Sequence, residues 1–120
     1  AYEADAAALE ALDRGWRKSS GLKGVTVKAR DLFRRPLLPS ELNNFDAVVI
    51  DPPRAGAKAQ AEMLAQSMVK RIAFVSCNPV TFARDAAILT KGGYRLEQVQ
   101  IIDQFRWSPH VELVAGFSRD

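Results

Sequence analysis

The sequence predicts an α/β fold with a mostly parallel sheet and an antiparallel last strand. Two apolar runs, residues 45–50 and 71–75, are nearly continuous, as expected for buried parallel strands. Each run is followed by a stretch with helical periodicity, residues 57–70 and 79–91. Because strands alternate with helices along the chain, we expect a doubly wound sheet.

Each of these helices has its own sequence signals. The helix over residues 57–70 is expected to bury four apolar side chains: Ala61, Leu64, Ala65 and Met68. The helix over residues 79–91 is preceded by Asn78, a favourable N-cap, and has Pro79 at its first position. Two glycines, Gly92 and Gly93, are expected to end it.

The beginning of the chain predicts a helix from Asp5, as its cap, to about Lys18, followed by a short strand over residues 25–29. Its apolar face is expected to carry three residues at helical spacing: Leu9, Leu12 and Trp16. At the other end, residues 94–103 predict a strand with a bulge and residues 111–117 predict another. Because the link between these two strands is short, we expect them to be antiparallel.

The composition limits the kinds of protein that this chain can be. With 120 residues, of which 48% are hydrophobic, it can form one modest domain and is not globally disordered. Its apolar runs fall short of the ~20 residues of a membrane span, so we expect no membrane partner. A single cysteine excludes an internal disulfide framework and a metal site built on several thiolates, so we expect no metal and a reducing, cytoplasmic location. The net charge of +3 permits an anionic partner such as RNA without requiring one.

Polar residues follow the predicted strands at their carboxyl ends, where α/β sheets bind ligands. Asp31, Asp51 and Cys77 occupy such positions. Cys77 is either a buried structural cysteine or a nucleophile. The nucleophile is favoured by its polar neighbour Ser76 and by the capped helix that follows, because the amides and dipole of a helix N-terminus stabilise a thiolate.

Two further segments have both a structural and a functional interpretation. Asp51-Pro52-Pro53-Arg54 is either a simple turn after a strand or a rigid wall that presents Asp51 and Arg54 to a ligand. Glu112 is either an exposed position on an alternating strand or a base that faces Cys77. The single histidine, His110, is expected to be a surface loop residue. The scattered arginines are either solvated surface or phosphate contacts: Arg30, Arg34, Arg35, Arg84, Arg95 and Arg106.

Taken together, three motifs resemble those of the S-adenosylmethionine-dependent RNA uracil-5 methyltransferases, which modify tRNA or 23S rRNA. In chain order they are Asp51-Pro52-Pro53-Arg54-Ala55-Gly56, then Ser76-Cys77-Asn78-Pro79-Val80-Thr81, then Asp103-Gln104-Phe105 with His110-Val111-Glu112. The resemblance extends over most of the chain and implies a Rossmann-like class I methyltransferase sheet.

The resemblance also implies roles for individual residues. Cys77 corresponds to the nucleophile that adds to C6 of uracil, and Glu112 to the base that removes the C5 proton. Three acidic residues correspond to the binding site for S-adenosylmethionine: Glu3 at the ribose, Asp31 near the adenine and Asp51 at the methionine end. We assign Arg54 and Asn78 to substrate binding.

The family's first strand and its glycine-rich turn have no counterpart in these 120 residues. We therefore expect residues 1–120 to be the carboxyl-terminal portion of a catalytic domain, incomplete as a sheet and inactive in isolation. The strand over residues 45–50 would then lack a neighbour and pair with residues 25–29 or with another molecule. Two other functions stay open: a noncatalytic RNA-binding or assembly segment, and a methylase of another pyrimidine or of a small molecule.

Overall fold

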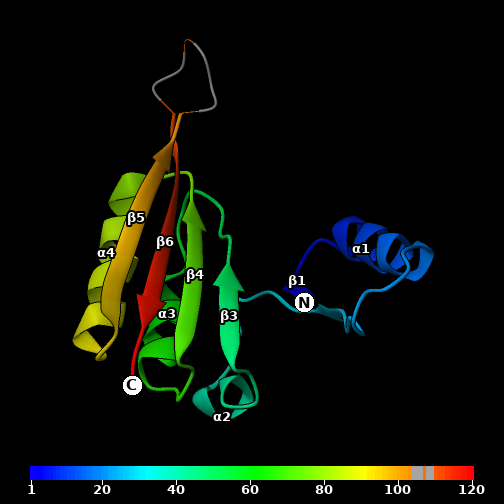
Figure 1. Ribbon diagram of the computed structural model, residues 1–120, viewed down its shortest axis with the longest axis horizontal. Helices are drawn as coiled ribbons and strands as arrows, with labels where there is room; N and C mark the ends of the chain where they lie inside the picture. Colours follow the sequence, from blue (N-terminus) through cyan, green and yellow to red (C-terminus); the bar gives the residue numbers. More distant parts are fainter. Residues whose placement is uncertain (104–106, 108–109) are drawn as a thin grey trace. The chain divides into compact units, whose positions relative to one another are not determined.

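The computed structural model describes residues 1–103, 107 and 110–120, and in it the chain divides into two compact units, Ala1–Pro36 and Leu37–Asp120 (Figure 1). Each unit has its own sheet. The first contains two strands in parallel and the second contains four strands in the order β3-β4-β6-β5.

The first unit consists of β1 (Tyr2–Glu3), α1 (Ala6–Lys18) and β2 (Lys28–Ala29). The predicted cap of α1 is confirmed, because the Asp5 carboxylate accepts a hydrogen bond from the Ala8 amide at 3.0 Å. The apolar face is narrower than predicted: Leu9 is buried, Trp16 is half-buried and Leu12 is 42% exposed.

The strand predicted over residues 25–29 is shorter in the structure. Only Lys28 and Ala29 pair, because β1 offers just two partners, Tyr2 and Glu3.

In the second unit, β3 (Ala47–Ile50) and β4 (Arg71–Ser76) are parallel, as predicted. β6 (Glu112–Ser118) lies between β4 and β5 (Arg95–Ile102) and is antiparallel to both, which confirms the antiparallel end of the sheet. The expected bulge in the first of the last two strands is also present, as a shift of register between Leu96 and Gln98. Among the described residues, β3 is paired only with β4 and forms an edge of this sheet.

Besides the short α2 (Pro39–Leu42), two helices, α3 (Lys58–Ala65) and α4 (Pro79–Lys91), belong to this unit. Figure 1 shows both of them on the same face of the four-stranded sheet. The core lies between the sheet and these helices, where Phe74 of β4 meets Phe82 of α4 edge to face, with ring centroids 5.5 Å apart.

The predicted start of α4 is confirmed, with Asn78 as N-cap and Pro79 at the first position. The end of α3 is not: the helix ends at Ala65 rather than near residue 70, and Met68, predicted to point inward, is 70% exposed. The Ser67 hydroxyl donates to the carbonyl of Leu64 at 2.9 Å and thereby ends the helix.

A distant residue completes this helix end. The Arg119 guanidinium, which follows β6, donates to the carbonyls of Ser67 at 2.9 Å and Ala65 at 3.2 Å. It also lies 3.6 Å from the ring centroid of Tyr94. Carbonyls at a helix C-terminus have no partner within the helix, and a cation satisfies them well.

A close approach of α3 and α4 gives a test of this packing. A Cβ atom at Gly92 would lie 2.5 Å from the Cβ atom of Ala65, so we expect Gly92→Ala to lower the free energy of unfolding by about 1–3 kcal/mol. The control is Gly15→Ala in α1, where nothing lies within 4 Å of the added atom and a gain of up to about 1 kcal/mol is expected. Urea unfolding of the full-length protein measures both, and equal effects would contradict the packing described here.

Candidate functional site

The carboxyl ends of β3 and β4 bring two predicted site residues to the same end of the strands, which we call the site edge. Because the strands are parallel, with Ile50 opposite Phe74, Asp51 and Cys77 leave the sheet at the same edge. Asp51 is exposed and Cys77 is half-buried.

Glu112 comes to this edge from the opposite direction. The last pair between the antiparallel strands β4 and β6 is Ser76 with Leu113. Cys77 comes directly after Ser76, and Glu112 comes directly before Leu113. The antiparallel register therefore brings Cys77 and Glu112 to neighbouring positions. Their sequence separation is large, and it is the antiparallel pairing that brings them together.

Both residues continue the same face of the sheet. In β4 the buried positions alternate with the half-exposed Ala73 and Val75, and Cys77 continues this second set. In β6 the half-exposed set includes Val114, which is paired with Val75, and Glu112. This is the face opposite to the one that packs on α3 and α4. The alternating pattern noted in the sequence is therefore real, and it gives Glu112 the same face as Cys77.

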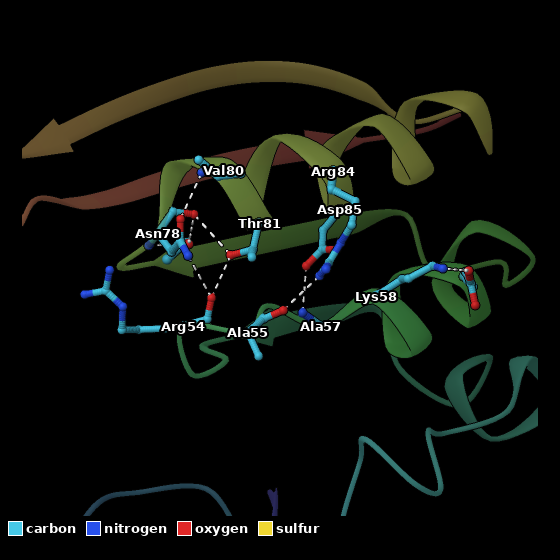
Figure 2. Close-up of polar contacts among 11 residues, drawn as sticks. Arg54, Ala55, Ala57, Lys58, Asn78, Val80, Thr81, Arg84 and Asp85 are labelled. Atoms are coloured by element: carbon cyan, nitrogen blue, oxygen red, sulfur yellow. Dashed lines mark hydrogen bonds and ion pairs between the residues drawn. The ribbon is translucent and has the colours of Figure 1, made fainter.

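The segment after β3 is fastened to the start of α4, as Figure 2 shows. The backbone carbonyl of Arg54 accepts hydrogen bonds from the Asn78 side-chain amide and from the Thr81 hydroxyl, both at 3.0 Å. The side-chain oxygen of Asn78 meanwhile accepts from the Val80 amide, at 3.0 Å, as the cap of α4. Asn78, assigned to substrate binding from the sequence, thus has two structural contacts in this structure.

A buried carboxylate makes the second fastening. Asp85 is fully buried, and its side chain accepts from the Ala57 amide at 2.6 Å and pairs with Arg84 at 2.8 Å (Figure 2). The hydrogen bond with Asp85 raises the pKa of the Arg84 guanidinium above its usual value. Ala57 precedes the first turn of α3, which has no side-chain cap of its own, so Asp85 of α4 serves as the cap of α3.

This arrangement requires a glycine at position 56. Gly56 has a φ of +79°, and a Cβ atom there would lie 2.6 Å from both Arg84 Nη2 and Asp85 Oδ2. Arg84 also donates to the Ala55 carbonyl at 2.9 Å. The turn therefore lies directly against the ion pair between the buried Asp85 and the exposed Arg84.

The Arg54 side chain makes a separate contact. One of its terminal nitrogens, Nη1, lies 3.0 Å from Nδ1 of His110, two residues before Glu112. Both side chains are exposed. His110 was predicted to be a surface loop residue, and no local feature of the sequence pointed to this partner.

The other two acidic candidates lie in the first unit. Glu3 ends β1, and its side chain accepts from the amides of Ala4 at 2.7 Å and Asp5 at 3.0 Å. Asp31 follows β2 and accepts from the amides of Phe33 at 2.9 Å and Arg34 at 3.2 Å. Since β1 and β2 are parallel, both carboxylates lie at the same end of the small sheet.

The sequence model of the tRNA (uracil-5-)-methyltransferase family matches residues 19–118. The chain belongs to this family. It is 64% identical to an uncharacterized RNA methyltransferase of Agrobacterium fabrum over 96% of this chain and 28% of that protein. It is 41% identical to the 23S rRNA (uracil(1939)-C(5))-methyltransferase RlmD of Hahella chejuensis over 83% of this chain and 24% of that protein.

A solved structure gives the same result for the fold. The tRNA (uracil-54, C5)-methyltransferase of Pyrococcus abyssi, in complex with S-adenosyl-L-homocysteine, matches with a TM-score of 0.81 and 32% identity, over 97% of this chain and 27% of that chain. The chain thus has the α/β fold of this family, and spans about a quarter of the length of the relatives it matches.

Four of the six arginines that were candidates for phosphate contacts have partners within the protein: Arg30, Arg34, Arg84 and Arg95. Arg30 donates to the backbone carbonyls of residues 35 and 36, and Arg34 pairs with Asp31. Arg95 pairs with Asp120 and Glu97. Arg106, like Gln104 and Phe105 of the third motif, lies outside the described residues.

Two observations about ligands and membranes concern the described residues alone. No group of three or more histidine, cysteine, aspartate or glutamate side chains in this part of the chain is arranged to hold a metal ion. Over the same residues, no helix is long and apolar enough to cross a membrane.

The sequence did not predict which residues hold the segment between β3 and α3 in place. They are Gly56, Thr81, Arg84, Asp85 and His110. One signal was present. Asp85 occupies an inward position of α4 together with Phe82, Ala86 and Leu89, and an acidic residue in an apolar helical stripe requires a buried partner.

The buried carboxylate can be tested by Asp85→Asn, which keeps its volume and removes its charge. An amide cannot offer oxygens to both Ala57 and Arg84, so we expect the free energy of unfolding to fall by about 1–3 kcal/mol. Urea unfolding of the full-length protein measures this. The control Glu62→Gln alters an exposed pair with Lys58 and is expected to change stability by less than about 0.5 kcal/mol. A loss no larger than that of the control would show that Asp85 is not required.

Proposed function

We propose that these residues are the catalytic part of an RNA methyltransferase that transfers a methyl group from S-adenosylmethionine to C5 of uridine. The observation that carries the proposal is the position of Cys77 and Glu112, which lie next to the Ser76–Leu113 pair, one on each of two neighbouring strands. Membership of the tRNA (uracil-5-)-methyltransferase family supports the same reaction.

Of the three carboxylates proposed to bind the cofactor because of the family resemblance, Glu3 and Asp31 belong to the first unit and Asp51 to the second. The Glu3 side chain is held by two backbone amides, which leaves a carboxylate fixed in orientation for ribose hydroxyls. Asp31 is held in the same way for the adenine amine. Asp51 follows β3 at the site edge and would hold the ammonium group of the methionine end. When bound, S-adenosylmethionine supplies an electrophilic methyl group, and the complex of the Pyrococcus relative with S-adenosyl-L-homocysteine supports this cofactor.

The chemistry needs a nucleophile because C5 of uracil is a weak one. The Cys77 thiolate adds to C6, and the electron pair of the C5–C6 double bond moves to C5 and the adjacent carbonyl. C5 can then take the methyl group, and the electron pair of the broken carbon–sulfur bond would stay on the sulfur of the departing S-adenosyl-L-homocysteine. One difficult substitution is thus divided into easier steps.

The second half of the reaction needs a base. The methylated C5 still carries its proton, which the Glu112 carboxylate removes. The electron pair restores the C5–C6 double bond and expels the Cys77 thiolate, so that the enzyme is regenerated. Because Cys77 and Glu112 lie at adjacent positions and continue the same face of two antiparallel strands, one ring bound at this edge can meet both groups.

The proposed partner is an RNA whose target uridine leaves its stack, at a cost of a few kcal/mol that is lower in a loop. Arg54, exposed on the loop after β3, would contact the flipped base or its phosphate, and Asn78 would line the same side of the site. The relatives act on 23S rRNA and on tRNA, and both stay candidates.

We further propose that the domain is completed by a first strand and a glycine-rich turn outside these 120 residues. The edge of β3 that is not paired with β4 would receive that strand, or another molecule when the segment is alone. The isolated segment would then be inactive. A cytoplasmic location fits, because a reducing compartment keeps the Cys77 thiol available.

The nucleophile is tested by Cys77→Ala in the full-length protein. RNA containing 5-fluorouridine should become covalently attached to the wild-type protein in the presence of S-adenosylmethionine. Fluorine takes the place of the C5 proton that the base would remove, so Cys77 is not released. We expect Cys77→Ala to lose both this adduct and all methylation of uridine. Gel mobility of the adduct and mass analysis of nucleosides measure the two effects.

Val80→Ala, an exposed position in the first turn of α4, controls for disturbance of the fold. If Cys77→Ala still formed the adduct, Cys77 would not be the nucleophile. Binding of RNA by a wild-type protein that forms no adduct would instead favour a noncatalytic RNA-binding segment, and a methylated product other than 5-methyluridine would identify a different methylase.

The base is tested by Glu112→Gln. Since the amide cannot remove the C5 proton, we expect methylated RNA to stay attached to Cys77 and turnover to fall by roughly 10²–10⁴-fold. Glu97→Gln is the matched control, because Glu97 lies at the opposite end of the β5–β6 pair. Loss of activity in Glu112→Gln without a trapped adduct would count against Glu112 as the base.

A further inference from the structure

Arg54 is held at both ends. Its backbone carbonyl accepts from Asn78 and Thr81 at the start of α4. Its guanidinium Nη1 lies 3.0 Å from Nδ1 of His110, in the segment that leads into β6. In Figure 2 the side chain extends away from α3 and α4, so the contacts with α4 fix the backbone and do not fix the charged group.

The chemistry of this contact determines the state of the histidine ring. A guanidinium group carries N–H donors only and has no acceptor. The contact between Arg54 and His110 is therefore a hydrogen bond only if Nδ1 accepts, which requires a neutral ring with its proton on Nε2. A protonated ring would place two donors and two positive charges against each other.

We propose that His110 is a positioning residue that holds the Arg54 guanidinium ready for an oxygen acceptor of the RNA substrate, either a phosphate oxygen or a carbonyl oxygen of the flipped base. This deepens the proposed function and rests on it. A guanidinium has five N–H donors in a rigid fork that suits such oxygens, and the contact with His110 uses one of them.

Exposure is the reason that Arg54 needs this support. A long, exposed arginine side chain samples many rotamers, and ordering them when RNA binds weakens the binding. The hydrogen bond to His110 selects one arrangement before RNA arrives. Because His110 lies two residues before Glu112, the same contact ties the strand that carries the proposed base to the loop after β3.

Three substitutions of His110 distinguish its role as a hydrogen-bond acceptor from the effect of its side-chain volume. Asn places its side-chain oxygen close to the position of Nδ1 and keeps an acceptor for Arg54, whereas Gln places its oxygen close to Nε2. We expect His110→Ala and His110→Gln to raise the Kd for substrate RNA about fivefold, equivalent to ~1 kcal/mol. His110→Asn is expected to bind like wild type. Retention of wild-type binding by His110→Ala, or no rescue by Asn, would overturn the proposal.

A double-mutant cycle tests whether His110 acts through Arg54. If it does, removing His110 in an Arg54→Ala background changes the Kd no further, whereas independent roles give additive losses. The Kd is measured with unmodified substrate RNA in the full-length protein, without turnover. Additive losses would overturn the proposal.

The contact itself is tested without RNA or activity. Nitrogen-15 shifts of the His110 ring in the full-length protein, assigned by comparison with His110→Asn, should report an unprotonated Nδ1 and a protonated Nε2, and should change in Arg54→Ala. The reverse tautomer would overturn the proposal. A wild-type protein that binds RNA but forms no Cys77 adduct would overturn the proposed reaction alone, because the Kd and tautomer results do not depend on turnover.

Discussion

The arrangement of the site depends on the buried Asp85 carboxylate. It accepts from the amide that precedes α3 and pairs with Arg84, so one side chain joins the two helices and closes the turn between β3 and α3. A charge that is removed from water is tolerated only when it is paired and hydrogen-bonded, and here both conditions are met. The turn that carries Asp51 and Arg54 is thereby fixed to the helix that follows Cys77, and these residues keep a constant relation to one another.

The second constraint is the antiparallel insertion of β6 beside β4. In a wholly parallel sheet, each strand delivers its carboxyl end to the site edge. An antiparallel strand delivers its amino end there, which is how Glu112, the first residue of β6, comes beside Cys77. A shift of one residue in this register would turn Glu112 to the face covered by α3 and α4. The buried Leu113, Ala115 and Phe117 oppose such a shift, because they would lose their places in the core.

What could be predicted from the sequence depended on how local its cause was. The cap at Asn78 and the position of Cys77 after a buried strand follow from adjacent residues and were predicted correctly. The end of α3 was predicted wrongly. Part of its cause is local, the Ser67 hydroxyl that donates to the Leu64 carbonyl, but the guanidinium that donates to the carbonyls of Ala65 and Ser67 belongs to Arg119, more than fifty positions later in the printed sequence. The contact of Arg54 with His110 could not be predicted either, because nothing in the local sequence around one residue points to the other. The proposed roles of Cys77 and Glu112 come from resemblance, and the register brings the two residues to neighbouring positions.

The second face of the sheet explains why so much of the site is open to water. Val49, Val75 and Val114 lie on the face opposite to α3 and α4, and Val49 is 75% exposed although it belongs to an apolar strand. A face of this kind is normally covered by a further layer of protein. Covering this face would also remove water from the ends of the strands where Cys77 and Glu112 lie, and electrostatic interactions are stronger where water is excluded.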